Sequence, residues 1–392
     1  MKHLYDARQY NLRQKIKEAA LDAYLVTAQD SIYYLTGATY RPIERPFFII
    51  MWPESEPDLV VPELERAHMR KAEGFREVQS YFEYPSVAGE NWFDKLNRML
   101  EGVKRLGIEP SVSAEITSEL SAYSLIPCGL VEALRRIKTE DEIACIRYAA
   151  RFADKGMALL IDNLYAGVSV IELFSLSRSL QQEMIKSGEY DPVTSEFLTV
   201  GWPAPKSAQP HSVPALDDRL DKGPLSMMCV LRANGYAAEC ERTVFLGVPT
   251  EEDRALFEHM RKARAIAFAM VRPGVSCSDI DAATRDYFAS QGLSQYILHR
   301  TGHGFGLGGH EAPWLSAGST DVLEKNMFIS IEPALYLPEI GGFRHSDTVL
   351  VTENGYESLT KYPTSIDELT LPTSKPLKAL KGRIIRQALG LK

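Results

Sequence analysis

The sequence predicts an α/β protein built from two domains. The chain has 392 residues, and since domains average about 150 residues, that length suits two or three of them. Hydrophobic residues make up 45% and charged residues 24%, which is ordinary for a globular chain that buries a full core. Strand-like segments alternate with helical ones in the first part, and long helices flank strand-like stretches in the second. We place the boundary near Ile137, which gives domains at 1–137 and 138–392.

Residues 1–137 are predicted to form a three-layer α/β unit. A charged helical stretch over 10–20 precedes a short apolar strand at 23–27. Two further strands follow at 46–52 and 58–62, and Pro62 opens another helical segment. Strands that alternate with helices favour a sheet covered on both faces.

The second domain is predicted to begin with a long amphipathic helix. Thr139 and Glu142 form a capping box, in which each side chain accepts a hydrogen bond from the other residue's backbone. Apolar residues then recur every three or four positions, at Ile143, Ile146, Ala150, Ala153, Met157 and Leu160. Later helices are expected from 250 to 272 and from 278 to 292, strands at 225–231, 236–246, 327–333 and 344–352, and a loosely packed basic helix after Pro372. The pattern indicates a mixed sheet flanked by helices.

Charge and composition exclude several classes of protein. There are 44 basic and 52 acidic residues, a net charge of −8, whereas a nucleic-acid-binding protein needs a basic face. The N-terminus has no signal-peptide core, and no apolar run approaches the ~20 residues that span a bilayer. The five cysteines form no Cys-x-x-Cys pair, which argues against a disulfide scaffold or a zinc ribbon and favours the reducing cytoplasm.

A predicted hairpin carries the first candidate site residues. Asn234-Gly235 is a strong turn signal between two strands. Because side chains alternate along a strand, Glu239 and Glu241 share one face, about 6.5–7 Å apart. The alternative is an edge strand whose charged face is solvated.

Two histidines and a further glutamate are the next candidates. His303 and His310 lie in a segment, residues 302–310, that contains five glycines, which let the backbone approach a ligand closely, although a flexible loop with incidental histidines is the alternative. Glu332 lies in an apolar segment, where an unpaired charge is costly. His211 lies in a proline-rich loop and taken alone is more typical of surface decoration.

Four motifs in order carry a family resemblance. They read GYAAECERTV from Gly235, GHGFGL with HEAP from Gly302, MFISIEP from Met327 and RHSDTVLVT from Arg344. This set resembles the pita-bread superfamily of methionine aminopeptidase, aminopeptidase P, prolidase and creatinase, over residues ~138–365. The first domain resembles the creatinase/prolidase N-terminal domain. The resemblance implies a creatinase-type three-layer domain followed by a pita-bread catalytic domain.

The resemblance also implies where a metal centre would lie. Peptidases of this superfamily hold two metal ions with two Asp, one His and two Glu. Matched by position, this chain has Met228, Glu239, His303, Glu332 and Ser346. A thioether and a hydroxyl cannot replace two carboxylates at hard divalent ions, so a two-metal centre is not expected.

Creatinase, the member that works without metal, is closer in pattern. The resemblance assigns His211 as the catalytic histidine, Glu241 and Glu332 as the paired glutamates and His303 as the glycine-flanked histidine. Arg45 matches an N-domain arginine that reaches the substrate carboxylate of the partner subunit, which implies a homodimer. A second carboxylate-binding arginine is replaced by Trp314, and the sequence keeps the peptidase-like His310-Glu311-Ala312-Pro313.

These residues lead to a hypothesis of metal-free hydrolysis. Glu239, Glu241 and Glu332 would converge on one pocket and repel each other. With no metal ligand and no cofactor expected, the simplest compensating charge is a cationic group of the substrate. His211 would act as general base and then general acid. His303 and His310 would bind substrate with Glu239, and Arg45 would hold its carboxylate. The predicted function is a creatinase-like hydrolase that cleaves a C–N bond in a small cationic or zwitterionic substrate.

Two alternatives stay open at this point. In the first, Glu239, His303 and Glu332 bind one divalent ion, and the chain is an Xaa-Pro-type peptidase or dipeptidase. In the second, the domain is an inactive protein-binding module. A small-molecule substrate is expected in the main reading, with no nucleic-acid or membrane partner.

Overall fold

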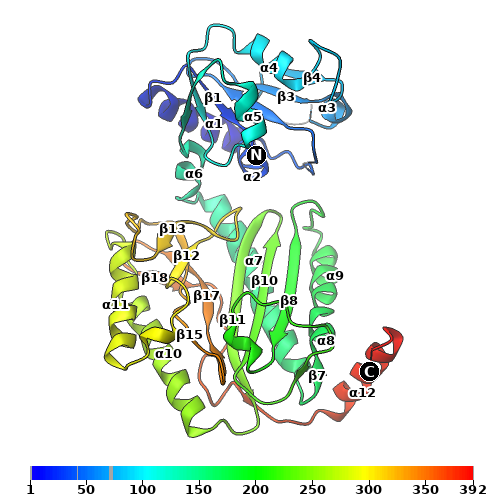
Figure 1. Cartoon of the computed structure of the whole chain (residues 1–392), viewed down its shortest axis with the longest axis vertical. Coiled ribbons are helices and arrows are strands. Elements are labelled where there is room, and N and C mark those ends of the chain that lie inside the picture. Colours follow the sequence, from blue (N-terminus) through cyan, green and yellow to red (C-terminus); the bar gives the residue numbers. More distant parts are fainter. Residues whose placement is uncertain (1, 42, 70–73, 392) are drawn as a thin grey trace. The chain divides into compact units, whose positions relative to one another are not determined.

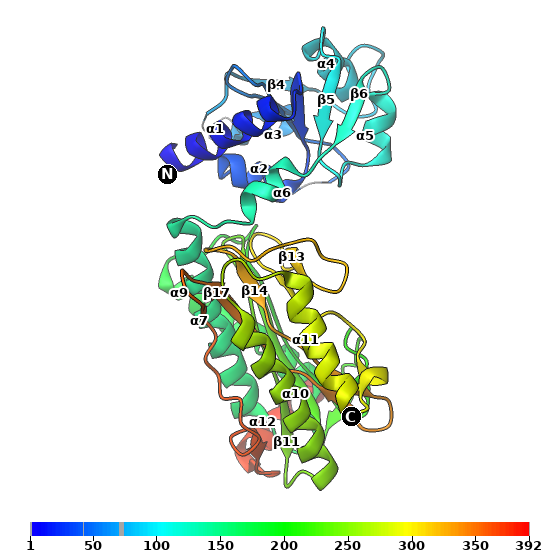
Figure 2. The same ribbon diagram turned by 90° about the vertical axis from the view of Figure 1, so that its left-hand side faces the viewer.

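The chain divides into two compact units. A computed structural model describes residues 2–41, 43–69 and 74–391. The units are Met1–Arg135 and Arg136–Lys392. Figures 1 and 2 show their helices and strands in two orthogonal views.

The N-terminal unit is a six-stranded mixed sheet with helices. Its strands are β1 (Ala23–Val26), β2 (Phe48–Met51), β3 (Asp58–Pro62), β4 (Glu77–Tyr81), β5 (Arg105–Ile108) and β6 (Ser124–Pro127). Its helices are α1 (Lys2–Glu18), α2 (Gln29–Thr36), α3 (Glu63–Met69), α4 (Trp92–Met99), α5 (Ala114–Glu119) and α6 (Leu130–Arg135). The strand order is β4-β3-β2-β1-β5-β6, with β1 antiparallel to β2 and parallel to β5.

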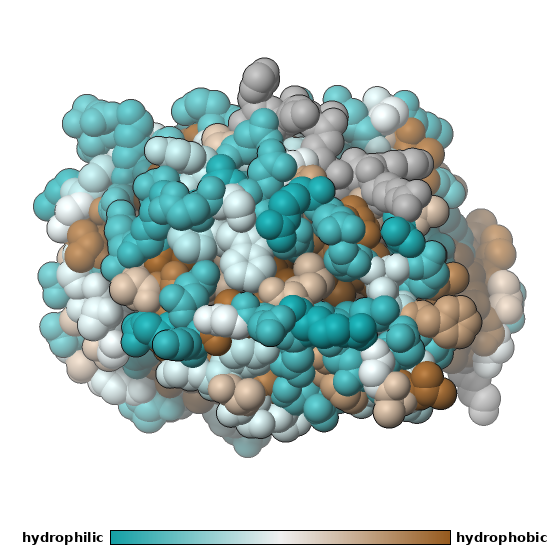
Figure 3. Space-filling view, turned by 90° about the horizontal axis from the view of Figure 1, so that it is seen from above, coloured by the Kyte–Doolittle hydropathy of each residue, from teal (hydrophilic) through white to brown (hydrophobic). Residues whose placement is uncertain are grey.

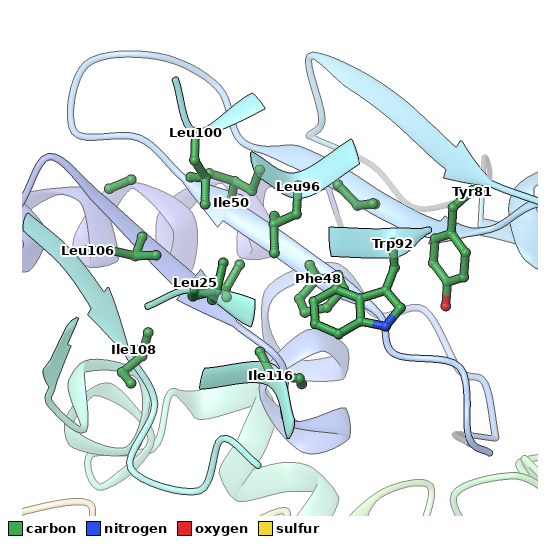
Figure 4. Packing of buried hydrophobic residues seen from close by; sticks show 13 residues of the cluster. Leu25, Phe48, Ile50, Tyr81, Trp92, Leu96, Leu100, Leu106, Ile108 and Ile116 are labelled. Carbon is green, nitrogen blue, oxygen red and sulfur yellow. The ribbon is translucent and has the colours of Figure 1, made fainter. Parts of the chain in front are cut away.

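Alternating strand residues build the core of this unit. Leu25 of β1, Phe48 of β2 and Leu106 of β5 point to one face and meet Trp92 and Leu96 of α4 (Figure 4). Every residue of β1, β2 and β3 is buried. Because successive side chains point to opposite faces, both faces of the sheet must be covered, as in the predicted three-layer arrangement.

The C-terminal unit contains the larger sheet. Its strands are β7 (Val168–Ser169), β8 (Glu196–Trp202), β9 (Arg219–Leu220), β10 (Leu225–Ala233), β11 (Tyr236–Leu246), β12 (Gly302–Gly304), β13 (Glu311–Leu315), β14 (Phe328–Ser330), β15 (Leu335–Leu337), β16 (Gly341–Phe343), β17 (Ser346–Val351), β18 (Tyr356–Ser358) and β19 (Thr370–Leu371). Its helices are α7 (Glu140–Asn163), α8 (Val170–Phe174), α9 (Ser177–Ser187), α10 (Glu251–Met270), α11 (Cys277–Ser290) and α12 (Pro376–Ala388), with short 3₁₀ turns at Lys206–Ala208 and Ser294–Tyr296.

The central hairpin of this sheet forms as predicted. The main path runs β13-β12-β14-β17-β11-β10-β8, so β11 lies between two partners and is not an edge strand. Asn234 and Gly235 have φ of 49° and 93° and connect the pair Ala233–Tyr236. Positive φ at both turn residues matches the twist of a two-residue hairpin.

The helices of this unit cover the sheet through the faces that the sequence indicates. Thr139 and Glu142 make the predicted capping box at the start of α7, and Thr250 and Asp253 make one at α10. The predicted apolar face of α7 is buried, and the helix contacts β10 and β11. Helices α10 and α11 pack together (Figure 2). The basic tail forms α12, where Gly382 is the buried residue and Leu377 is 83% exposed.

Some boundaries differ from the predictions. The strand expected at 327–333 is limited to β14, and Glu332 lies two residues beyond its end because the chain turns toward β15 there. The strand expected at 344–352 starts at Ser346. Strands β4, β5, β6 and β8 had no predicted counterpart. In β4 the residues Glu77, Gln79 and Ser80 are polar, so this segment lacks the apolar run that marks a strand.

None of the described helices combines the length and apolar character that crossing a bilayer requires. The face shown in Figure 3 carries mostly hydrophilic side chains with small apolar groups between them.

Candidate active site

A cavity of about 390 Å³ opens in the C-terminal unit and contains most of the predicted site residues. Its walls come from β8, β10 and β11 (Figure 1), from the loop around His211 and from the glycine-rich segment before β13. The lining residues are Leu198, Trp202, Pro210, His211, Ser212, Met228, Val230, Glu239, Glu241, His299, Arg300, Gly309, His310, Glu332 and Arg344.

Three buried carboxyl groups converge on this cavity. Glu239 and Glu241 project from the same face of β11, and Glu332 reaches it from beyond β14. Burial and the nearby Glu332 carboxyl together raise the pKa of Glu239 to about 8, with burial the larger cause. Burial and mutual repulsion also raise the pKa of Glu241 and of Glu332. The predicted convergence of like charges is present in the structure.

A positive charge for this cluster comes from the chain itself. Arg344 Nε lies 2.5 Å from Glu241 Oε2, and Arg344 Nη2 donates to Glu241 Oε1 at 3.0 Å. The same Nη2 lies 3.9 Å from the sulfur of Met228. Arg344 is buried, and the surrounding carboxylates raise its pKa, so it stays charged. The substrate therefore does not have to supply the compensating cation, which corrects the physical argument for a cationic substrate.

His303 presents an unsatisfied buried nitrogen to the carboxyl groups. Its Nδ1 lies 3.1 Å from the carbonyl oxygen of Gly304, which assigns the proton to Nδ1. Its Nε2 has no hydrogen-bond partner among the residues that the structure describes, and it lies 3.3 Å from Glu332 Oε1 and 4.0 Å from Glu239 Oε1. Burial and the adjacent His310 lower the pKa of His303 well below its usual value, so the ring is neutral. A neutral nitrogen lone pair beside carboxyl oxygens is stabilised by a proton on the carboxyl group or by a cation bound between the nitrogen and the oxygens.

One divalent ion fits this donor set. Ligand atoms of Glu239, His303 and His310 lie within 4.8 Å of one another, and the rings of the two histidines stack with centroids 3.8 Å apart. Burial also lowers the pKa of His310, which favours the neutral form that metals bind. Two histidines and one carboxylate are a ligand set that catalytic zinc sites use, with positions left for water and substrate.

A second ion does not fit beside the first. Met228 contributes a thioether at the cavity wall, and Ser346 donates its hydroxyl to Glu239 Oε1 at 2.5 Å. The guanidinium of Arg344 lies against Met228 and repels any added cation. The absence of a two-metal centre stays a prediction, which the chemistry of these three side chains supports.

His211 lies at the exposed rim of the cavity. The loop that carries it is anchored by Trp202, whose Nε1 donates to the carbonyl oxygen of Ser212 at 2.8 Å. Its side chain reaches the same cavity as Glu239, Glu241, Glu332 and His310.

Arg300 is a cation of the cavity that the sequence analysis missed. Its guanidinium lies 4.4 Å from the ring centroid of Trp314, and its buried Nε has no hydrogen-bond partner in the described part of the chain. No carboxylate among the described residues pairs with it, although it lies close enough to lower the pKa of Glu332 and His310. Trp314 stands where the resemblance places an arginine, so the sequence analysis expected no cation here. Arg300 supplies one, with its guanidinium over the Trp314 ring.

Arg45 lies in the N-terminal unit and is already paired. Its guanidinium donates to both carboxylate oxygens of Glu83, at 2.5 and 3.2 Å, and lies 3.3 Å from Glu44. Its role toward a substrate stays a prediction.

A hydrogen-bonded chain behind Arg344 was also missed. Arg344 Nη1 donates to the hydroxyl of Tyr336 at 3.3 Å, and that hydroxyl lies 2.8 Å from His299 Nε2. His299 Nδ1 lies 2.7 Å from the carbonyl oxygen of Arg300, which assigns its proton to Nδ1. Burial lowers the pKa of His299 to about 4. Side chains two residues apart on a strand point to the same face, so Arg344 on the predicted strand shares a face with Ser346, a position matched to a metal ligand. That spacing was the signal that could have identified Arg344.

Comparisons with known proteins agree with this site. The model of metallopeptidase family M24 matches residues 144–353, and that of the creatinase/prolidase N-terminal domain matches residues 8–137. The chain is 31% identical over 348 residues to the Xaa-Pro dipeptidase of Pyrococcus horikoshii, which covers 87% of this chain and 93% of the relative. The structure of the prolidase from the same organism covers 92% of this chain and 99% of its own, with a TM-score of 0.78 and 27% identity. The structure of dipeptidase PepE from Mycobacterium ulcerans covers 95% of this chain and 99% of its own, with a TM-score of 0.81 and 25% identity.

The fold and the cluster of ligand-like side chains define an enzyme of the creatinase and Xaa-Pro peptidase superfamily. The chain belongs to metallopeptidase family M24, whose model matches more than half of its residues. The predicted family and fold class are confirmed. The expectation of no cofactor is wrong, because the matching family is one of metallopeptidases and His303, His310 and Glu239 fit an ion. The relatives favour the peptidase alternative over the creatinase-like reading.

Proposed function

We propose that this chain is a dipeptidase that holds one divalent ion and hydrolyses dipeptides with a C-terminal proline. The observation that carries the proposal is Nε2 of His303, which has no hydrogen-bond partner among the described residues and lies 3.3 Å from Glu332 Oε1 and 4.0 Å from Glu239 Oε1. The Xaa-Pro dipeptidase relative and the prolidase structure support the substrate class.

The ion would be held by Glu239, His303 and His310, with Glu332 beside them. A divalent ion in such a site polarises a peptide carbonyl and makes water a better nucleophile at neutral pH. The second ion of a two-metal centre is replaced by Arg344, a fixed cation that neutralises Glu241 and is not exchanged with solvent.

The remaining groups of the cavity move protons. Glu332 has a raised pKa and lies beside the ligand cluster, so its carboxyl can accept a proton from water and release it again near neutral pH. His211 stands at the rim, where it can donate a proton to the leaving nitrogen. These roles keep His211 and Glu332 as proposed catalytic residues, whereas Glu241 positions Arg344.

The cavity also explains how a prolyl dipeptide would be oriented. Leu198, Val230 and Trp202 offer apolar surface for a pyrrolidine ring. Arg344 is committed to Glu241, so Arg300 is the cavity cation without a carboxylate partner among the described residues. We assign Arg300 to the substrate's terminal carboxylate, because a guanidinium binds a carboxylate through two parallel hydrogen bonds.

Hydrolysis of Ala-Pro and of Ala-Pro amide, assayed with added Mn²⁺ or Zn²⁺, tests both parts of this proposal. We expect the acid to be cleaved with a kcat/KM at least about tenfold above that of the amide, since a lost charge-assisted hydrogen bond weakens binding by that factor or more. Arg300→Gln should remove the preference and Arg300→Lys should restore part of it. No cleavage of either dipeptide contradicts the activity, whereas cleavage without preference contradicts only the role of Arg300.

A further inference from the structure

A buried ion pair ties the glycine-rich segment of the candidate active site to the start of α7. Lys138 Nζ lies 2.9 Å from Glu311 Oε1, and the two side chains are 1% and 15% exposed. Lys138 directly precedes Thr139, the N-cap of α7, and Glu311 directly follows His310. Neither is among the described residues that line the cavity, so the proposed peptidase chemistry does not explain why this pair is buried.

His310 is the least enclosed of the three ligand-like side chains at the proposed metal site. Glu239 and His303 are buried, whereas His310 is exposed. Its ring stacks on the ring of His303, with an angle of 29° between the planes. The chain just before it is loosely packed, because a Cβ added at Gly309 would meet nothing within 4 Å. Glycine allows the backbone many conformations, so the place of the His310 ring depends on what fixes this segment.

The carboxylate of Glu311 fixes the glycine-rich segment. Its Oε2 accepts the backbone N–H of Gly308 at 3.2 Å. A Cβ added at Gly306 would clash with Glu311 Oε1, so the carboxylate lies directly against the backbone at a position that requires glycine. The N–H of Gly306 donates to the carbonyl oxygen of Gly308 at 3.1 Å, and its own carbonyl oxygen accepts the N–H of Ala237 in β11 at 2.8 Å. The turn that leads to His310 is therefore tied to the Glu311 side chain.

Lys138 supplies the charge that keeps this carboxylate in place. A carboxylate removed from water needs a hydrogen-bonded cation to offset the lost hydration. The N–H of Lys138 donates to the carbonyl oxygen of Asn326 at 3.0 Å, and its Nζ lies 3.3 Å from the carbonyl oxygen of Arg136. Helix α7 begins two residues later and packs on β10 and β11. The pair thus anchors the glycine-rich segment to an element that also supports the strand of Glu239.

We propose that Lys138 and Glu311 are positioning residues for the candidate metal site. Their ion pair holds residues 306–310 so that His310 reaches the ion together with the buried ligands. The inference rests on the proposed function, because it concerns the ion of that site. Partners that orient a ligand without touching the ion change metal affinity by about 10–100-fold when they are removed. A segment that is already fixed also avoids the entropy cost of ordering a glycine-rich chain around the ion.

Titration of chelator-treated protein with Mn²⁺, in which electron paramagnetic resonance measures the free ion, tests the proposal. Glu311→Gln keeps the shape of its side chain and Lys138→Met removes only the charged end, and each should weaken Mn²⁺ binding about tenfold or more. The double variant Lys138→Met, Glu311→Gln leaves no uncompensated buried charge, so its unfolding free energy should exceed that of Lys138→Met. Its affinity for Mn²⁺ should stay weak, because the segment has lost its anchor.

A mutant cycle with His310 tests whether the pair acts through that ligand. His310→Ala should weaken Mn²⁺ binding, and adding it to the double variant should cause little further loss. Glu172→Gln is the matched control: Glu172 pairs with Arg386, their side chains are 7% and 16% exposed, and neither is among the described lining residues of the cavity. This variant should lower the unfolding free energy and leave the affinity for Mn²⁺ unchanged.

The outcomes separate this proposal from the proposed function. Absence of Mn²⁺ binding by the unmodified chain overturns both. Unchanged affinity in Glu311→Gln, recovery of affinity together with stability in the double variant, fully additive losses with His310→Ala, or an equal loss in Glu172→Gln would each overturn the positioning role and leave the metal site in place.

Discussion

Arg344 is the residue on which the charge balance of the cavity depends. It is buried and contacts Glu241 through two nitrogens, within a cluster that also contains Glu239 and Glu332. Arg344→Met should destabilise the fold by about 3 kcal/mol or more, since removing one partner leaves a buried charge uncompensated. The double variant Glu241→Gln, Arg344→Met should recover most of that loss in urea unfolding. A double variant as unstable as the single one would show that the pair does not carry the effect.

The buried carboxyl groups predict how the stability of the metal-free protein depends on pH. The pKa values of Glu239 and Glu332 are higher in the folded state than in the unfolded state. The folded protein therefore binds more protons, and the stability that these two carboxyl groups contribute is lost as pH rises from their unfolded pKa through about 8. Histidines whose pKa is lowered, such as His303, oppose this only below about pH 6.5, where the unfolded imidazole takes up protons. Between pH 6.5 and 8 the glutamates dominate, and the denaturation midpoint should fall.

Denaturation of chelator-treated protein at several pH values measures this effect. Glu239→Gln should flatten the curve between pH 6.5 and 8, and added metal should also reduce the slope because a cation favours the ionised carboxylate. A midpoint that rises across this window in the unmodified chain would contradict the assigned pKa directions.

At the scale of elements, the hairpin β10–β11 positions Glu239 and Glu241. Gly235 has φ of 93°, a conformation that costs a residue with a Cβ about 1 kcal/mol or more. Gly235→Ala should therefore lower the unfolding free energy by about that amount and reduce hydrolysis, because the register of β11 depends on this turn. Gly355→Ala is the matched control: its φ is ordinary and an added Cβ meets nothing within 4 Å. Equal stability of the two variants in urea unfolding would show that the turn conformation is not limiting.

The elements also show what local sequence can and cannot predict. The turn at Asn234-Gly235, the capping boxes of α7 and α10 and strand β11 were all predictable, because each depends on neighbouring residues. Strand β4 was not, since its mostly polar, half-buried residues carry no apolar run and form a strand by pairing with β3. The pairing of Arg344 with Glu241 joins positions 103 residues apart, and no spacing rule reveals it. The charge that the sequence analysis assigned to a substrate is therefore supplied by the protein.

At the scale of the whole molecule, the homodimer and the role of Arg45 stay predictions. Light scattering coupled to gel filtration should give twice the mass of one chain. If the N-terminal unit completes the partner's site, Arg45→Gln should raise the KM for Ala-Pro while kcat changes little. A monomer with full activity would rule out a contribution from the partner subunit.

The central claim is that one divalent ion, and not two or none, binds at Glu239, His303 and His310 beside the permanent cation Arg344. Metal analysis of protein dialysed against Mn²⁺ or Zn²⁺, combined with Ala-Pro hydrolysis as metal is added back after chelation, tests it most directly. We predict one ion per chain, activity lost with chelator and restored at one equivalent, and no retained ion in His303→Ala, with His259→Gln as control. Two ions per chain, or full turnover by metal-free protein, would contradict the account.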